Sequence, residues 1–486
     1  MSARRVPVLL ETDPARIASG LQPDRHPLGS VLWEVGDNAK FYSGKIRRLV
    51  PASTVADFGA GVVRGIAQQQ TADGVRWIWA SSGAVVSRWY GPSVENIHTF
   101  ADHEVNQSST EQATFIDFTA YGDWTILNNS INAAQVYKPV GPTKAEYAAG
   151  IIPLRFMKMY SFVLAIGWDV QGKSVGASDS VDVEDWDFES TTNTANSLVL
   201  EDLETRIRAA TYLGKNVAVY AEDQMGLIYF AGAPAWIGRQ MGPNGIGAVG
   251  KAAVCSDKQL NYGISRNGIW RTDGQDYGYI DEGILHDYLQ EGVNWGQGSK
   301  CLAFRNDVNR TIEFHFPMGA ATEPSEGWAF DPATGGWSKV PGVTFADERR
   351  LFRRPLVGFS DGVIKLLEDN TALTAALSLK TKPMLVQRDD GSPLHADTKV
   401  DEVELMLKAA TAVEFRYGVQ DSAAEATTWS EWYACSVGMQ LVQLENMPSG
   451  TLHRLEFRST AAVWVLDLQG FALFGLTAGA KKSGGV

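Results

Sequence analysis

The chain has 486 residues, of which 10% are aromatic, 20% are charged and 48 are glycine. This mixture favours many short strands and tight turns over long helices, and the length allows two or three domains or one large propeller. The formal net charge of −13 argues against a surface that binds nucleic acid tightly, although it is compatible with a channel through which DNA slides.

Residues 1–54 are predicted to form an extended N-terminal arm. The stretch from Gly20 to Pro51 is rich in proline and glycine and contains one short strand pattern, at Val31 to Val35. The apolar run from Val6 to Leu10 is interrupted by a proline and is too short for the core of a signal peptide. We therefore expect a protein that is synthesised in the cytoplasm.

Residues 55–370 contain a recurring unit of strand, tight turn and strand. The turn at Arg266 to Gly268 is the strongest signal, because Asn-Gly adopts positive φ at little cost. Successive units lie roughly 40–55 residues apart, which is the length of a four-stranded blade. The sequence therefore predicts an all-β propeller of about six to eight blades, with hairpins at 74–90, 118–139, 162–175, 216–232, 260–274, 301–317 together with 327–340, and 355–369. Helical periodicity is weak, and only Leu200 to Gly214 predicts a helix.

The blade rhythm ends near residue 370. Residues 371–399 are predicted to be a connector, and residues 400–476 alternate apolar and polar positions as in a small antiparallel, sandwich-like β domain. The longest apolar stretch, Ala461 to Ala480, contains Asp467 and Gln469 and therefore predicts strands, with no membrane span. Residues 477–486 are expected to be disordered.

Searching for chemistry gives no catalytic motif, so the sequence predicts a protein that is not an enzyme and that holds no metal or cofactor. His98 and His103 lack a third ligand at a recognisable spacing and favour a polar loop over a metal site. The glycine-rich Gly242 to Gly250 favours a crossover between blades over a dinucleotide loop. Three cysteines without C-x-x-C spacing indicate a reducing compartment, at Cys255, Cys301 and Cys435.

Charged residues form two kinds of cluster. The acidic segment "DSVDVEDWDFES" alternates carboxylates with apolar residues, which favours a solvated or channel-facing strand over the paired carboxylates of a glycosidase. Its candidate channel or loop residues are Asp182, Glu184, Asp185 and Asp187. Two basic islands are candidate assembly contacts, with solvated loops as the alternative, at Lys45, Arg47 and Arg48 and at Arg349, Arg350, Arg353 and Arg354.

The order of several phrases carries a resemblance: "DNAKFYSGKIRRL", "FTAYGDWTILNNSINAAQVYKP", "DVEDWDFES", "NVAVYAEDQMGLIYFAG" and "GAVGKAAVCSDKQLNYGISRNGIWRTDG", followed by a β-rich C-terminal region. Over residues 20–475 the chain resembles the propeller proteins of short-tailed bacteriophages that are known as tail nozzle, tail hub or packaged-DNA stabilisation proteins. The resemblance implies a homo-oligomeric ring, expected to be a hexamer, that lies below the portal and adaptor, retains the packaged genome and gates its ejection. It implies no catalytic residues.

The same resemblance sets the expected partners and location. The head-to-tail adaptor is expected above the ring, with tail fibre or needle proteins beside it and transient, non-specific contact with the translocating DNA. The protein is then expected in the virion tail, after assembly in the host cytoplasm. An acidic ring lumen would repel DNA phosphate and lower friction. The alternative is a tail propeller that binds host-surface glycans or a carbohydrate-active propeller enzyme, because 15 Trp and 15 Tyr could supply stacking platforms.

Overall fold

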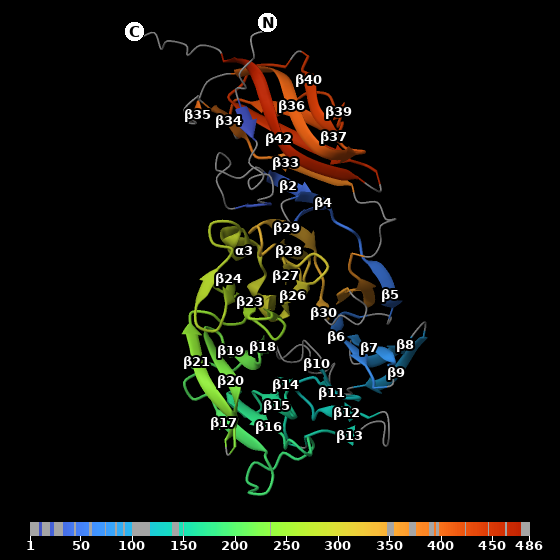
Figure 1. Ribbon diagram of the computed structural model, residues 1–486, viewed down its shortest axis with the longest axis vertical. Coiled ribbons are helices and arrows are strands. Elements are labelled where there is room, and N and C mark those ends of the chain that lie inside the picture. Colours follow the sequence, from blue (N-terminus) through green and yellow to red (C-terminus); the bar gives the residue numbers. More distant parts are fainter. Residues whose placement is uncertain are drawn as a thin grey trace.

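The structure is a computed structural model and shows an elongated molecule with a propeller at one end and a sandwich of sheets at the other (Figure 1). It describes residues 9–11, 20–23, 33–42, 45–57, 61–72, 74–82, 85–90, 93–99, 117–138, 145–148, 150–233, 235–347, 354–368, 376–387, 393–394, 398–422, 424–445, 447–461 and 464–477.

The described strands of residues 53–366 form seven four-stranded antiparallel sheets, the blades of the propeller. Blade 1 contains β6 (Val63–Gln70), β7 (Arg76–Ser82), β8 (Val85–Tyr90) and β9 (Ser93–Thr99). Blade 2 contains β10 (Asp117–Tyr121), β11 (Trp124–Asn128), β12 (Gln135–Tyr137) and β13 (Ala145–Glu146). Blade 3 contains β14 (Arg155–Met159), β15 (Phe162–Ile166), β16 (Ser174–Ala177) and β17 (Asn196–Val199).

Three further blades follow in chain order. Blade 4 contains β18 (Ala209–Leu213), β19 (Asn216–Tyr220), β20 (Gln224–Gly232) and β21 (Trp236–Asn244). Blade 5 contains β22 (Val254–Asp257), β23 (Leu260–Ser265), β24 (Gly268–Thr272) and β25 (Tyr277–Tyr279). Blade 6 contains β26 (Leu302–Asn306), β27 (Thr311–Phe316), β28 (Glu326–Phe330) and β29 (Trp337–Pro341). The all-β propeller prediction is confirmed.

The seventh blade closes the ring with a strand from the beginning of the chain. It contains β30 (Phe345–Asp347), β31 (Leu356–Gly358), β32 (Val363–Leu366) and, at its outer edge, β5 (Ser53–Asp57). Strands β32 and β5 pair with each other, and Ile364 lies opposite Ala56. Its innermost strand β30 contacts β6 of the first blade. Both ends of the propeller segment therefore meet in one sheet.

Two further sheets form the sandwich. One contains β1 (Leu9–Glu11), β42 (Val465–Thr477), β36 (Thr398–Thr411) and β40 (Gly438–Gln443) in this order. The other contains β2 (Trp33–Asp37), β33 (Leu377–Thr381), β41 (Leu452–Ser459), β34 (Met384–Gln387) and β35 (Pro393–Leu394), with β37 (Glu414–Gln420) beside β41 and the short β38 (Thr428–Trp429) and β39 (Tyr433–Ala434) beside β37. Both sheets contribute buried side chains to one hydrophobic cluster, including Leu405, Leu473, Tyr417 and Phe457.

Three expected segment assignments differ from the structure. The described parts of residues 1–54 do not form a separate arm, because they supply strands to the sandwich and to blade 7. Residues 371–399 do not form a simple connector, because they contain β33, β34 and β35. The helix expected at Leu200 to Gly214 is wrong: Ala209–Leu213 is the innermost strand of blade 4, and sheet pairing outweighs its local helix propensity. Residues 478–486 lie outside the described part of the chain.

A small hairpin, β3 (Ala39–Tyr42) and β4 (Lys45–Arg48), lies between the sandwich and blade 6. Phe41 belongs to a hydrophobic cluster that runs from Trp33 in the sandwich to Trp337 in blade 6. The backbone N–H of Phe41 donates to Ser338 Oγ at 2.8 Å. The sandwich and the propeller therefore share one core. The described helices are short: α3 (His286–Gly292) and the 3₁₀ helix η2 (Trp295–Lys300) precede blade 6.

Ring closure by β5 can be tested at Ala56, which is buried against the core of blade 7. We expect Ala56→Asp to lower the free energy of unfolding by about 3 kcal/mol or more, because it places an unpaired carboxylate in an apolar site. Urea unfolding would measure the loss. Thr54→Asp, at an exposed position of the same strand, is the control and should change the stability by less than about 0.5 kcal/mol. Equal losses in the two variants would contradict a closing role for β5.

Candidate functional site

The candidate site lies on one face of the propeller. Because each blade is an antiparallel meander, the loops that lead into the innermost strands and the loops that join the second and third strands lie on the same face. We call this face the Lys251 face, after the residue at its centre. The loop of residues 245–253 connects β21 of blade 4 to β22 of blade 5 and carries Lys251.

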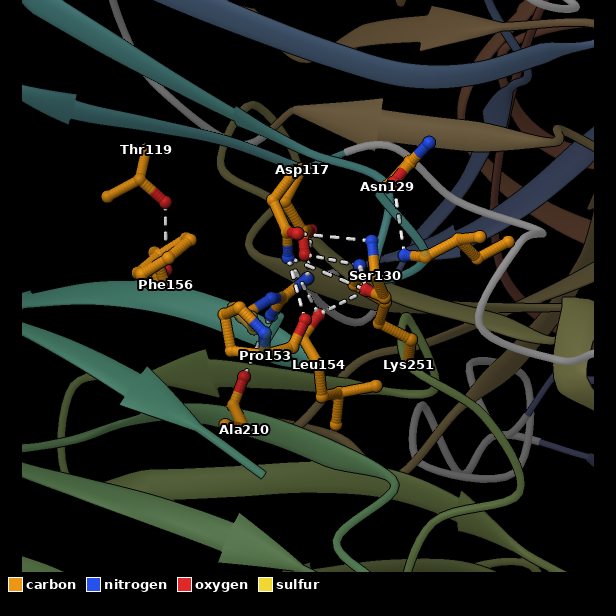
Figure 2. A network of polar contacts seen from close by, with 12 residues as sticks. Asp117, Thr119, Asn129, Ser130, Pro153, Leu154, Phe156, Ala210 and Lys251 are labelled. Atoms are coloured by element: carbon orange, nitrogen blue, oxygen red, sulfur yellow. Dashed lines mark hydrogen bonds and ion pairs between the residues drawn. The ribbon is translucent and has the colours of Figure 1, made fainter. Parts of the chain in front are cut away.

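A network of buried polar side chains joins four blades on this face (Figure 2). The Lys251 ammonium lies 2.6 Å from Asp117 Oδ2, at the start of β10 in blade 2. It also donates to Ser130 Oγ at 2.9 Å. The other carboxylate oxygen of Asp117 lies 3.1 Å from the guanidinium of Arg155 in blade 3, and Arg155 donates to the carbonyl of Ala210 in blade 4 at 2.8 Å. Blade 5 is thereby linked to blades 2, 3 and 4.

The two adjacent asparagines after β11 shape the blade 2 part of the network. Asn128 donates through Nδ2 to the carbonyl of Pro153 at 3.0 Å, and its Oδ1 accepts from the N–H of Ser130 at 3.0 Å. Asn129 Oδ1 accepts from the N–H groups of the second and third residues that follow it, at 3.0 and 2.9 Å. These bonds replace the strand ladder where it ends and hold Ser130, which has positive φ, within hydrogen-bond distance of Lys251.

The electrostatics of the network favour an ion pair. Burial by itself would raise the pKa of Asp117, but the charges of Arg155 and Lys251 outweigh it and hold the pKa below its ordinary value. Burial lowers the pKa of Lys251, and the Asp117 carboxylate opposes this shift. Both side chains are almost fully buried, so each charge depends on the others for its compensation.

Behind the network lies an axial cavity of about 360 Å³, lined by the innermost strands of the seven blades. Asp117 and Arg155 lie at one end of it, and the exposed Lys158 and Tyr212 lie at strand positions toward the other end. In the part of the chain that the structure describes, no group of three His, Cys, Asp or Glu side chains is placed to hold a metal ion. The arrangement is a structural network that links four blades across the propeller axis.

The acidic residues singled out in the sequence lie elsewhere. Asp182, Glu184, Asp185 and Asp187 lie in the loop between β16 and β17, on the opposite face of the propeller. The expected strand is wrong, because successive turns form there: the Asp182 and Asp185 carboxylates accept backbone N–H groups two residues further on, at 3.1 and 2.9 Å. None of the four lines the axial cavity.

The two basic islands are placed only in part. Arg47 is exposed and Arg48 half-buried on β4, and the side chain of Lys45 lies outside the described residues. Arg354 is half-buried before β31. Arg349, Arg350 and Arg353 lie outside the described part of the chain, so their role as assembly contacts stays a prediction.

Sequence reasoning missed the residues of the network. Lys251 stands alone in the run "GAVGKAAV", where small and apolar residues predict a buried crossover. A single cation in such a run is the signal that could have pointed to a buried ion pair. Its partner could not be identified, because Asp117 is far away in the sequence.

Comparisons with known proteins concern the fold alone. No family model matches the sequence, and no curated protein matches it. The solved structure of YCF48 from Cyanidioschyzon merolae aligns over 66% of this chain and 100% of its own, with 11% identity and a TM-score of 0.41. The β-propeller domain of Cps50 (Swd1) from Myceliophteria thermophila aligns over 66% and 100%, with 9% identity and a TM-score of 0.41. PorZ, a surface component of the type-IX secretion system of Porphyromonas gingivalis, aligns over 81% and 46%, with 8% identity and a TM-score of 0.40.

No helix among the described residues is both long and apolar enough to cross a membrane.

The contribution of the buried network to stability can be tested by removing the charge of Lys251. Lys251→Met keeps the length of the side chain but leaves Asp117 buried with Arg155 as its remaining cationic partner. We expect the free energy of unfolding to fall by about 3 kcal/mol. Lys215→Met, at an exposed turn position, is the matched control and should have little effect. A Lys251→Met variant as stable as the wild type in urea unfolding would show that the pair contributes nothing.

The pH dependence of the free energy of unfolding tests the contribution of the Asp117 carboxylate. Because the pKa of Asp117 is depressed in the folded state, its stabilisation is present above the unfolded pKa of about 3.9 and is lost as the pH falls through the folded value. The stability difference between the wild type and Asp117→Asn should therefore be largest near pH 7 and shrink by about 1 kcal/mol toward pH 3. Urea unfolding at pH 7, 5 and 3 would measure it. A difference that grew with acidification would have the wrong sign.

Proposed function

We propose that this chain is a structural assembly protein without catalytic activity, a tail nozzle or hub subunit of a short-tailed phage. Its copies would form a ring, expected to be six-fold, below the portal and adaptor, where the ring retains the packaged genome and gates its ejection. The adaptor above and tail fibre or needle proteins would be its partners in the virion. This proposal extends the sequence resemblance with two features of the molecule.

The observation that carries the proposal is an apolar sheet edge at the sandwich end of the molecule. Strand β40 is at the edge of its sheet among the described strands, and only β36 pairs with it. Met439 and Leu441 on this strand are 75% and 54% exposed, and Val437 just before it is 65% exposed. Free backbone groups beside exposed apolar side chains are a template for association with another chain. Contact between copies would cover them.

The closed axis of the propeller is consistent with this role. The Lys251 network crosses one end of a cavity of only about 360 Å³. A DNA duplex, whose major groove alone is about 12 Å wide, would need a much larger open passage along the axis. In the proposed ring, DNA would therefore pass between the copies and not through a propeller. Each propeller would act as a rigid wall element.

A second candidate function is glycan binding, and one surface feature favours it. Tyr160 is 55% exposed and lies beside Phe230, with ring centroids 5.2 Å apart. Phe230 also lies beside Trp236, with ring centroids 6.3 Å apart. These rings, on blades 3 and 4, could stack against sugars. Phe230 and Trp236 also pack on Phe162 in the core of blade 3, which is sufficient reason for the presence of these two rings.

The proposed assembly can be tested by light scattering and negative-stain imaging of the purified chain, alone and with the portal–adaptor complex. We expect six-fold rings that cap the complex. Leu441→Lys should weaken self-association by about tenfold or more, because it places a charge at the contact between copies. Val170→Lys, at a fully exposed position of blade 3, is the control and should assemble normally. A strict monomer that binds polysaccharide would overturn the proposal in favour of the second candidate.

A further inference from the structure

A tyrosine and a histidine are in contact inside the sandwich. The side chains of Tyr417 on β37 and His453 on β41 are both fully buried. The Tyr417 hydroxyl lies 2.6 Å from His453 Nδ1, and the two rings stack with their centroids 6.0 Å apart. His453 shares its face of β41 with Leu455 and Phe457, which belong to the hydrophobic cluster of the sandwich. The pair therefore lies between the two sheets.

The hydrogen bonding of this pair leaves one ring nitrogen of His453 without a partner. Burial raises the pKa of the Tyr417 hydroxyl, so the hydroxyl keeps its proton and donates it to His453 Nδ1. The neutral imidazole then carries its own proton on Nε2. His453 Nε2 is buried, and among the described residues no group accepts a hydrogen bond from it. The ring is therefore accommodated in its neutral form only.

The strands around His453 supply no charge that could compensate a protonated ring. Met384 of β34 lies opposite His453, and the four residues of β34 are not ionisable. The charged residues of β37 and β41 alternate to the outer face of their sheet, where they form ion pairs. These pairs are Arg416–Glu456, Arg458–Glu414 and Arg454–Glu34.

The facing sheet does not supply such a charge either. The ionisable residues of β36 and β42 are exposed or half-buried: Lys399, Asp401, Glu402, Glu404, Lys408 and Asp467. Among the described residues, no charged group contributes to a shift in the pKa of His453. Burial alone acts on the ring, and it lowers the pKa of His453 to about 4.

We propose that His453 makes the sandwich a proton-sensitive element, which opens in mildly acidic surroundings. A protonated ring donates from both nitrogens, but the Tyr417 hydroxyl oxygen is the one acceptor in contact with it among the described residues. The charge is therefore accommodated only when β41 separates from its neighbours and the ring reaches water. The opening does not depend on the proposed assembly. If the assembly is right, opening would also disturb β40, which pairs with β36 of the facing sheet.

The sign of the pH dependence follows from the depressed pKa. The folded chain binds a proton at His453 less readily than the unfolded chain, in which the pKa of an imidazole is about 6.5. The stabilisation is therefore fully present above pH 6.5 and is lost as the pH falls from about 6.5 toward 4. Within this window the equilibrium constant for opening rises by up to about tenfold for each pH unit.

The test measures hydrogen exchange of the full chain by mass spectrometry at pH 7 and pH 5, corrected for the intrinsic exchange rates. We expect the equilibrium constant for opening of β37 and β41 to rise by roughly twentyfold between these pH values, because the unfolded chain takes up the proton. Strand β23 of blade 5 is the control within the same sample and should change by less than about threefold. No rise in β41, or an equal rise in β23, would overturn the proposal.

Three substitutions separate proton uptake from structural damage. His453→Gln can still accept from the Tyr417 hydroxyl but takes up no proton, so the acid-dependent rise should shrink to less than about threefold. Tyr417→Phe removes the hydrogen bond but keeps the imidazole, so the rise should persist. His286→Gln, at a half-exposed histidine paired with Asp281, is the matched control and should leave the rise in β41 unchanged.

The decisive outcome is the pH dependence of each variant and not its stability at pH 7. A His453→Gln variant in which β41 opens with the acid dependence of the wild type would sink the idea. Loss of the acid dependence in Tyr417→Phe would assign the effect to the hydrogen bond and would equally contradict the proposal. If His453→Gln does not fold, the wild-type comparison of β41 with β23 still decides.

Discussion

The pairing of β5 with β32 is the constraint on which the rest of the molecule depends. A propeller of seven sheets has two free ends until some strand joins the last blade to the first part of the chain. Here the joining strand lies at residues 53–57 and its partner at 363–366, so more than 300 residues are enclosed in one loop. Such a contact forms late and at a high cost in chain entropy, but once formed it leaves the ring without an open blade.

The same N-terminal segment ties the propeller to the sandwich. Strand β2 pairs with β33 in the sandwich, and β5 pairs within blade 7, with only residues 38–52 between them. Within this short segment the Lys40 side chain is buried and forms ion pairs with Glu313 at 3.2 Å and with Glu368 at 2.9 Å. Burial opposes the charge of Lys40, but the two carboxylates outweigh it and raise its pKa. These ion pairs fix the N-terminal segment on blades 6 and 7, directly beside the strand that closes the ring.

Local chemistry made the blades predictable from the sequence. The turn at Tyr121 to Asp123 places Tyr121 opposite Trp124, and the pairing of the 301 and 327 hairpins in one blade follows from the spacing alone. What the sequence could not show are contacts between distant segments. The residues around β5 do not indicate that it pairs with β32, and the residues around Lys251 do not indicate that its partner is Asp117. Both contacts join residues far apart in the sequence, and they form only when the blades pack into a ring. The helix expected at Leu200 to Gly214 failed for a different reason, because Ala209–Leu213 forms a hairpin with the next strand, β19, and this pairing outweighs its helix propensity.

The loop of residues 245–253 connects blade 4 to the network of buried polar side chains at the propeller axis. Gly247 approaches the backbone of Glu222 so closely that a β-carbon would lie 1.9 Å from its carbonyl oxygen, which fixes the path of the loop. The N–H of Ala248 donates to the carbonyl of Ala221 at 2.9 Å, and Lys251 then reaches Asp117 of blade 2. One short segment thus fixes the crossover between blades 4 and 5, because its backbone is bonded to blade 4 and its lysine is paired with a carboxylate of blade 2.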